Sequence, residues 1–402
     1  MPLGMGLLYL LHFLVARDFG AEAYGEFVFA VAVGSILAIL VTGGGPASAQ
    51  KFISYYSSAN NVDTKNRFIV YGLWYLCCSS FVILLAALVL ILAGHYFDFE
   101  TQTYFNSLLV AGATLLWLWQ RYVCLGHGRV ILAIVPRDIL MPCALVLILI
   151  LSVDTVSIQT FIYYYSAATA LFCLSALYLC TKTVVDIQLK QLRLPELQSW
   201  LLSGRSFMIT TAMQLGLNNW DLIILGMFAG LEETGKYAAA SRLAMVLLIV
   251  VRIANTLIGH KFSALFADGD TKRAFVYFRQ IRSYCFYIGL AVFGVLIVSH
   301  EYIFSVIGDD YSGLGVLLII FAVANFLCVA FGPVVQYLNM TGRESEVAKL
   351  MLFWSLVSVL GNLVAIPLSG VMGAALVYFI SNIGLRWHLS VLMNRKAIAN
   401  SV

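Results

Sequence analysis

The sequence predicts an all-α integral membrane protein with about twelve transmembrane helices in two parallel six-helix lobes. Three features predict it: an apolar composition, long apolar runs separated by short charged stretches, and an internal repeat. Hydrophobic residues make up 61% of the 402 residues and charged residues 11%, and the mean hydropathy is +0.92. A soluble domain carries roughly 25% charged residues because its surface faces water. The composition therefore leaves no room for a folded soluble domain, and the net charge of +4 is too small to indicate a nucleic-acid partner.

The apolar runs indicate where the helices lie. A helix needs about 20 apolar residues to cross the hydrocarbon, where backbone groups cannot stay unpaired. The first run is short and follows no basic residue, so we expect the sequence to lack part of helix 1. We expect kinks at Pro136, Pro142, Pro333 and Pro367, which lie inside predicted segments. The predicted segments extend approximately over 3–16, 27–43, 69–93, 105–124, 131–152, 158–180, 206–229, 237–258, 283–300, 313–337, 349–368 and 371–392.

The basic residues predict the orientation of the chain. Lysine and arginine in short loops stay on the cytoplasmic side of a membrane. If the N-terminus is cytoplasmic, 21 of the 24 basic residues fall on that side, and the exceptions are Arg17, Lys236 and Arg242. We therefore expect both termini in the cytoplasm and an even number of helices.

The chain also repeats itself. A shift of 210 residues aligns Gly20–Phe27 with Gly230–Tyr237, and a shift of 214 aligns Gly128-Arg129 with Gly342-Arg343. The matches fall at the same loops in the same order, which indicates two halves of six helices. Because six is even, the halves point the same way through the membrane, as in an alternating-access transporter. The predicted parts are an N-terminal lobe at 1–181, a cytoplasmic amphipathic linker at 182–204 and a C-terminal lobe at 205–402.

The seventh segment carries a row of polar side chains. Gln214, Asn218 and Asp221 are spaced i, i+4 and i+7, so they share one face of a continuous helix, and Asn219 lies beside them. Polar groups within a span usually face the bundle interior or water. We expect this row to line a cavity. The alternative is that Asp221 pairs with Arg242 on the next segment.

Arginines inside the spans are the second polar feature. Arg137 precedes Asp138 in the fifth segment, and Arg242 and Arg252 lie in the eighth. Charged groups in the hydrocarbon are costly, so they are candidates for function. Arg121, Arg242 and Arg252 have a structural alternative, because each lies within about two turns of a helix end and could extend to the lipid headgroups.

Residue types that carry chemistry are scattered. No histidine, cysteine or carboxylate has the spacing of a nucleophile and its base or of a metal site, so we expect no catalytic residue, metal, disulfide or cofactor. The cysteines and histidines are Cys77, Cys78, Cys124, Cys143, Cys173, Cys180, Cys285 and Cys328, and His12, His95, His127, His260, His300 and His388.

Several motifs resemble one family. The first half contains LVARDFGAEAYGEF (Leu14 to Phe27), the glycines Gly43 to Gly45 and KFISYY (Lys51 to Tyr56). The second half contains NNWDLIILG (218–226), TGKYAAASRLA (234–244), FADGD (266–270), MTGRE (340–344) and IPLSGVMGAAL (366–376). In this order they resemble bacterial polysaccharide exporters of the Wzx type, within the multidrug/oligosaccharidyl-lipid/polysaccharide exporter superfamily.

The resemblance implies a flippase of the bacterial inner membrane. Its substrate would be an undecaprenyl-diphosphate-linked oligosaccharide, an O-antigen or capsular repeat unit, moved from the cytoplasmic to the periplasmic leaflet. Membrane lipids, a polysaccharide polymerase and chain-length proteins would be its partners. Arg137, Arg242 and Arg252 are the candidates for the diphosphate, because a planar guanidinium pairs with phosphate oxygens. Gln214, Asn218 and Asn219 would bind substrate, and Asp221 and Asp138 would orient the arginines or carry a coupled proton or cation.

Other transporter and enzyme classes fit less well. The nearest alternative is a multidrug or cation antiporter of the same superfamily, which fold alone does not exclude. A major-facilitator transporter would show a glycine-aspartate-arginine signature in the loop at 50–68, which is absent. A polymerase or ligase needs an extended outer loop, and the longest one here, near His95 to Tyr104, has about ten residues. Helix 1 carries only Arg17, at its end, so we do not expect a peptidoglycan precursor as substrate.

Overall fold

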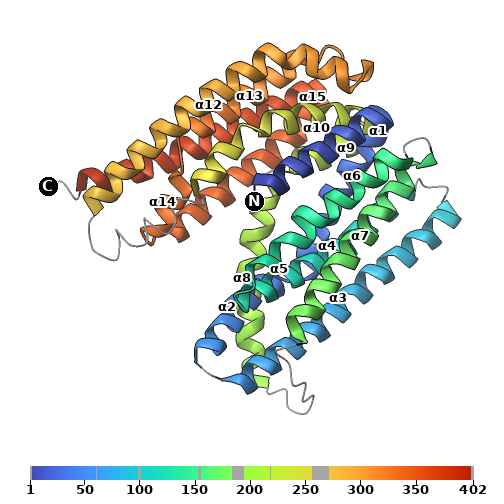
Figure 1. Ribbon diagram of the computed structural model, residues 1–402, viewed down its shortest axis with the longest axis vertical. Helices are drawn as coiled ribbons and strands as arrows, with labels where there is room; N and C mark the ends of the chain where they lie inside the picture. The colour runs from blue at the N-terminus through green and yellow to red at the C-terminus, as the bar shows by residue number, and fades with distance from the viewer. Residues whose placement is uncertain are drawn as a thin grey trace. The chain divides into compact units, whose positions relative to one another are not determined.

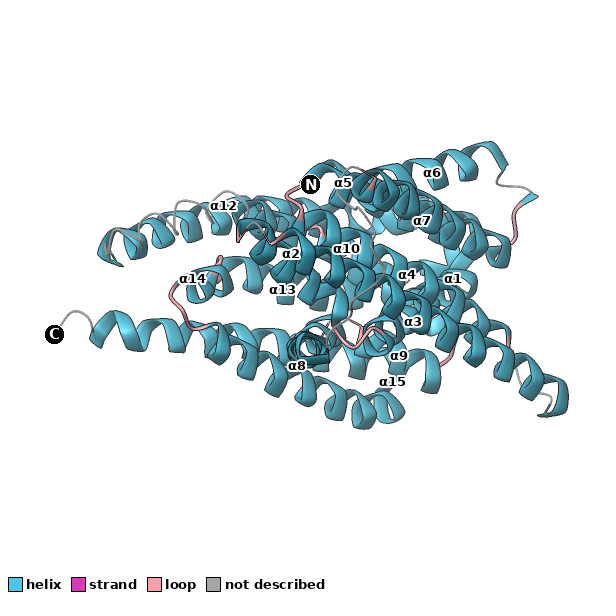
Figure 2. Cartoon of the chain, turned by 90° about the horizontal axis from the view of Figure 1, so that it is seen from below, coloured by secondary structure: helices cyan, strands magenta, loops and turns pink. Residues whose placement is uncertain are grey.

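The computed structural model describes residues 2–59, 61–97, 101–152, 155–182, 194–217, 219–255 and 271–399. These residues form helices joined by short loops and contain no strand, as Figure 2 shows, which confirms the predicted all-α class. The chain divides into two compact units. The first comprises Leu3–Phe19 and Glu26–Leu215, and the second comprises Gly20–Gly25 and the chain from Gly216 onward.

The first unit is organised around α4. This helix packs along α7, α2 and α3, and α5 also lies against it (Figure 1). The buried Trp200 fastens α8 to the same unit, because its Nε1 donates to the Tyr56 hydroxyl at 3.0 Å. The elements are α1 (Pro2–Val41), α2 (Gly45–Ser58), α3 (Val62–Phe97), α4 (Gln102–Gly126), α5 (Val130–Val135), the π-helix η1 (Pro136–Leu140), α6 (Met141–Ser152), α7 (Ile158–Thr181) and α8 (Leu194–Gly216).

The second unit is organised around α13, which packs against α12, α10 and α15 (Figure 1). The short α9 lies along α15 and α10. The elements are α9 (Trp220–Phe228), α10 (Leu231–Met245), a helix at Leu248–Asn255, α12 (Thr271–Ile307), the 3-10 helix η3 (Asp309–Tyr311), α13 (Gly315–Ala330), α14 (Val334–Met340) and α15 (Glu344–Ala399).

The predicted segments fall on these helices in order. A span of the ~30 Å hydrocarbon requires about 20 residues, so α1, with 40 residues, is about twice as long as needed and α15, with 56, is nearly three times as long. Each changes direction at a glycine with positive φ, Gly20 (φ 81°) or Gly370 (φ 56°), and so supplies two segments. Within the described residues eight helices are long and apolar enough to cross a membrane, and α10 with the helix after it makes a ninth, bent by 49°. The seventh predicted segment falls on α8 and α9.

The predicted prolines act as expected at two positions. Pro136 begins the π-helix η1, and Pro333 separates α13 from α14. Proline has no backbone N–H to donate, so it disrupts the regular helical ladder. The predicted linker at 182–204 lies partly outside the described residues, at 183–193, and the predicted lobe boundaries stay a prediction.

The internal repeat is visible in the backbone. Gly20 and Gly230, which the sequence aligns, have nearly the same conformation, at φ 81°, ψ 178° and φ 92°, ψ 168°. Gly128 and Gly342 have φ of 73° and 74°. Each is followed by an arginine whose Nη1 donates to a carbonyl near the C-terminal end of the sixth predicted segment of its half. The Arg129 donor lies 2.9 Å from the Leu179 oxygen, and the Arg343 donor 2.8 Å from the Leu392 oxygen.

Candidate functional site

In the first unit, the π-helix places Arg137 against two aromatic side chains. The Arg137 Nη2 donates to the Tyr165 hydroxyl at 3.3 Å, and the guanidinium carbon lies 3.9 Å from the centre of the Trp117 ring. A cation at this distance from an indole is stabilised by about 0.5–2 kcal/mol, depending on how far it is desolvated. Arg137 follows the start of α5 by seven residues, about 10 Å along a helix, so it is held well inside its span.

A second arginine approaches the same indole. The Arg121 guanidinium carbon lies 5.5 Å from the Trp117 ring centre, and its Nη1 lies 3.9 Å from the Asp138 carboxylate. Trp117, Arg121, Arg137, Asp138 and Tyr165 therefore form one group, the arginine–tryptophan cluster, with two positive charges and one negative. Asp138 pairs with Arg121 from α4, although the sequence places it next to Arg137.

The arginine–tryptophan cluster has an unused donor. The Arg137 Nε is buried and has no hydrogen-bond partner among the described residues. A buried guanidinium N–H without an acceptor is unfavourable, because it has given up water without replacement. The net positive charge and the open donor fit an anion with several oxygens, such as a phosphate.

In the second unit, Asp221 lies in the core. It is 5% exposed, and its carboxylate accepts a hydrogen bond from the Tyr237 hydroxyl at 2.5 Å and one from the Leu222 backbone at 2.9 Å. Arg242 acts on this carboxylate through charge, at longer range than a hydrogen bond. The alternative of a direct Asp221–Arg242 ion pair therefore does not hold, because Tyr237 takes the place of the guanidinium.

Aromatic contacts extend this arrangement across the unit. The Tyr237 and Phe321 rings meet edge to face at 4.9 Å, and Phe321 meets Tyr378 in the same way at 5.1 Å. The Tyr378 hydroxyl donates to Asn325 at 2.9 Å. We call Asp221, Tyr237, Phe321, Tyr378 and Asn325 the aspartate–tyrosine network. It joins α9, α10, α13 and α15.

The polar row predicted on the seventh segment is interrupted. The structure ends α8 at Gly216 and begins α9 at Trp220, so Gln214 and Asp221 lie on different helices and their i, i+7 spacing does not apply. Glycine and asparagine have low helix propensity, and a Cβ on Gly216 would overlap the Trp220 indole. Gln214 lies on α8, Asn219 is half-buried at the start of α9, and Asn218 lies outside the described residues.

The predicted arginines of the eighth segment differ in environment. Arg242 is half-buried in the last turn of α10, and its Nε is buried without a hydrogen-bond partner in the described part of the chain. Arg252 is exposed on the helix Leu248–Asn255, which fits a side chain that extends to the headgroups.

Sequence reasoning missed the aromatic members of these groups, which are Trp117, Tyr165, Tyr237, Phe321 and Tyr378. An aromatic residue in an apolar segment gives no signal of its own, because aromatics also fill the lipid-facing surface. Trp117 and Arg121 are spaced i, i+4 in one segment, and this pairing was the available signal.

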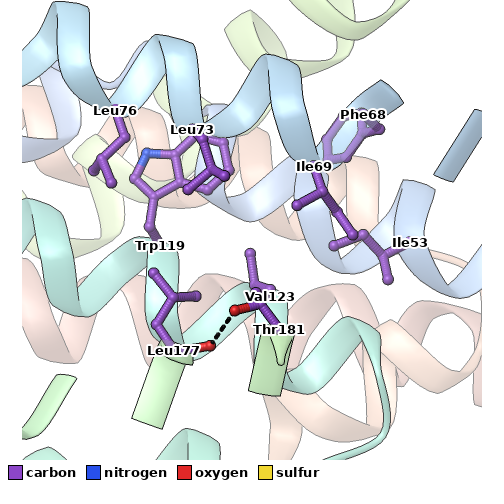
Figure 3. Close-up of a pocket in the computed structure, with 9 residues that line it drawn as sticks. All are labelled: Ile53, Phe68, Ile69, Leu73, Leu76, Trp119, Val123, Leu177 and Thr181. Carbon is purple, nitrogen blue, oxygen red and sulfur yellow. Dashed lines mark hydrogen bonds between the residues drawn. The ribbon is translucent and has the colours of Figure 1, made fainter. Parts of the chain in front are cut away.

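An apolar pocket between α2, α3, α4 and α7 of the first unit is too small to bind a substrate. Its free volume of about 10 Å³ is at most what one water needs (Figure 3). Its walls are apolar side chains of α2, α3, α4 and α7, including Ile53, Leu73, Trp119 and Leu177. It is therefore part of the core. In the regions that the structure describes, no three histidine, cysteine or acidic side chains are grouped as metal ligands.

Solved transporter structures share this fold. An inward-facing structure of a multidrug resistance MATE family transporter of the MOP superfamily has a TM-score of 0.75 at 14% identity, covering 98% of this chain and 94% of that chain. The lipid II flippase MurJ in an inward closed conformation has a TM-score of 0.73 at 14% identity, covering 97% and 86%. A MOP superfamily transporter from Pyrococcus furiosus Vc1 has a TM-score of 0.63 at 13% identity, covering 99% and 93%.

Sequence comparison identifies the family. No curated protein sequence matches the chain significantly. Residues 3–258, well over half of the chain, match the family described as polysaccharide biosynthesis protein. The chain therefore belongs to the polysaccharide biosynthesis protein family and has the fold of the multidrug/oligosaccharidyl-lipid/polysaccharide exporter superfamily, as its motifs predicted.

Proposed function

We propose that this protein is an alternating-access flippase that moves an undecaprenyl-diphosphate-linked oligosaccharide from the cytoplasmic to the periplasmic leaflet of a bacterial inner membrane. The family and the fold support a transporter of this superfamily. The observation that supports an anionic lipid as substrate is the arginine–tryptophan cluster. It holds two guanidinium groups and one buried N–H without an acceptor inside the span.

The chemistry of the substrate explains the need for a protein. Each sugar hydroxyl moved into hydrocarbon without a partner costs about 4–8 kcal/mol on the alkane scale, so one repeat unit alone faces a prohibitive barrier. A polar path removes this barrier while the lipid tail stays in the bilayer. Arg137 supplies the diphosphate with a charge that persists in a low dielectric, because a guanidinium does not lose its proton there.

Asp221 is our candidate for coupling. Its carboxylate is buried, and it is bound by a neutral hydroxyl instead of a cation, so it can exchange between a charged form and a protonated or cation-bound form at limited cost. In this proposal the first unit holds the diphosphate through Arg137 and the second unit carries the coupling through Asp221, with Arg242 setting the local field. Polymerase and chain-length proteins would receive the product in the outer leaflet.

The first test replaces Arg137. In a strain that depends on this protein for surface polysaccharide, Arg137→Gln should abolish export and leave protein levels normal. The substitution removes both the positive charge and the planar guanidinium that can pair with two phosphate oxygens. Arg137→Lys should retain only part of the activity, since an ammonium cannot stack on Trp117 and reach Tyr165 together. The measurement is the amount of surface polysaccharide and of lipid-linked oligosaccharide left on the cytosolic face.

The matched control is Arg279→Gln, which removes an exposed arginine of α12. It should export normally. Normal export from both Arg137→Gln and Arg242→Gln would refute the assignment of the arginines.

A multidrug or cation antiporter is the second candidate, supported by the likeness to a MATE family structure and by the buried Asp221. Drug accumulation in a strain without other efflux pumps separates the two functions. Reduced accumulation on expression, with no effect on polysaccharide, would favour the antiporter.

A further inference from the structure

The segment Gly20–Gly25, which we call the elbow, packs with the second unit, although the residues on both sides of it pack with the first. The chain therefore passes into the second unit and back within six residues. It turns at Gly20, where φ is 81°. Asp310 then fixes the elbow, because its Oδ2 accepts a hydrogen bond from the Ala21 backbone at 3.2 Å.

The elbow crosses its own counterpart in the repeat, which is Gly230 and the first helical turn of α10, up to Gly235. A Cβ on Gly25 would overlap the Leu231 carbonyl oxygen, and a Cβ on Gly235 would overlap the Ala21 carbonyl oxygen. Each added Cβ would also lie 2.9 Å from the backbone nitrogen of the other glycine. The two backbones therefore touch reciprocally, and at both positions only glycine permits the approach.

The side chains around this crossing are buried. Tyr24 and Tyr311 are each 1% exposed, and Thr234 is fully buried. Separating the two turns would expose these side chains and release the Ala21 N–H from Asp310. Backbone groups without partners are costly near hydrocarbon. Opening the crossing is therefore an expensive way to move.

We infer that the elbow stays fixed on the second unit throughout the transport cycle, so that the crossing of Gly25 and Gly235 is a permanent pivot and not a gate. The backbone then bends at the two ends of the elbow, between Phe19 and Gly20 and between Gly25 and Glu26. The inference rests on the proposed function only in assuming that the protein cycles between conformations.

Hydrogen exchange tests the pivot without any substrate. In the full-length protein in lipid nanodiscs, the segments 21–25 and 231–235 should be equally protected, because one opening event would expose both. Gly25→Ala should speed exchange in 231–235, and Gly235→Ala should speed it in 21–25, each by about tenfold or more. Gly6→Ala is the control on the same helix, since a Cβ there meets nothing within 4 Å. Unequal protection, or variants that leave the opposite segment unchanged, would overturn the inference.

A covalent lock tests it in the working protein. In a background without the eight native cysteines, Ala21→Cys with Asp310→Cys should form a disulfide under oxidation, seen by mass spectrometry. Transport by the locked protein should stay within about twofold of the reduced form. Two outcomes would overturn the pivot. In the first, the locked protein loses transport and reduction restores it, which would show that the crossing is a gate. In the second, the disulfide fails to form, which would contradict the fixed position of Asp310.

The proposed function can fail separately. If the hydrogen-exchange pattern is as expected but the parent protein moves no lipid-linked oligosaccharide, the proposed function is wrong and the pivot is still supported.

Discussion

The buried carboxylate of Asp221 is stabilised by a tyrosine hydroxyl and not by a paired cation. A carboxylate in an apolar core is costly unless its oxygens are hydrogen-bonded. Tyr237 and the Leu222 backbone supply these bonds, and Arg242 contributes only through its longer-range charge. Because no cationic side chain among the described residues is bound directly to the carboxylate, its protonation or the binding of a cation need not first break an ion pair.

Removing the Tyr237 hydroxyl should therefore destabilise the protein. Tyr237→Phe leaves the Asp221 carboxylate with one donor fewer, and the free energy of unfolding should fall by about 1.5–3 kcal/mol. Tyr378→Phe is the matched control in the same network. Its hydroxyl donates to the neutral Asn325, so the loss should be only about 0.5–1.5 kcal/mol. Reversible unfolding in detergent micelles measures both, and an equal or larger effect at Tyr378 would contradict the role given to Tyr237.

Among the helices, the fifth predicted span shows how irregular backbone serves the site. Pro136 opens a five-residue π-helix between α5 and α6. A π-helix adds a residue to the turn and so rotates the side chains that follow, and such irregularities are frequent at functional sites. Here it carries both Arg137 and Asp138, one toward Trp117 and the other toward Arg121.

Paired turns link corresponding helices of the two halves, and they make a second prediction. Gly128 and Gly342 have positive φ, so Gly128→Ala and Gly342→Ala should each lower the free energy of unfolding by about 1 kcal/mol or more. Gly112 and Gly294 lie inside α4 and α12, where a Cβ meets nothing within 4 Å. Alanine there should be neutral or stabilising by up to about 1 kcal/mol. Similar effects at all four glycines in a thermal unfolding assay would argue against equivalent turns.

The arrangement of the chain in the membrane gives the last prediction. The excess of basic residues on one side predicts cytoplasmic termini, and this follows from charge alone. A green fluorescent protein fused after Val402 should fluoresce, because it folds in the cytoplasm. Alkaline phosphatase inserted at 153–157, which is predicted to lie outside, should be active. The opposite pattern of the two reporters would reverse the orientation and with it the direction assigned to transport.

Much of this protein could be predicted from its sequence because the bilayer imposes local rules. A span needs a certain length of apolar residues, so the class, the order of the segments and the breaks at Pro136 and Pro333 follow from short stretches of chain. The repeat was also visible in the sequence, where Gly20 aligns with Gly230 and Gly128 with Gly342. The structure agrees, because the two glycines of each pair have similar positive φ angles. The break between α8 and α9 was not predicted, because we interpreted the polar spacing of Gln214, Asn218 and Asp221 as one face of a continuous helix.

The partners within each site depended on packing between distant segments. Arg137 and Asp221 were chosen from the sequence because a charge in a span is unusual, but their neighbours Trp117, Tyr165 and Tyr237 look like ordinary membrane-facing aromatics until the helices meet. The same holds for Asp138, which pairs with Arg121 from α4. Hydrophobicity is a property of each segment and can be read along the chain, whereas a hydrogen bond or an ion pair exists only between atoms that the fold brings within a few ångströms.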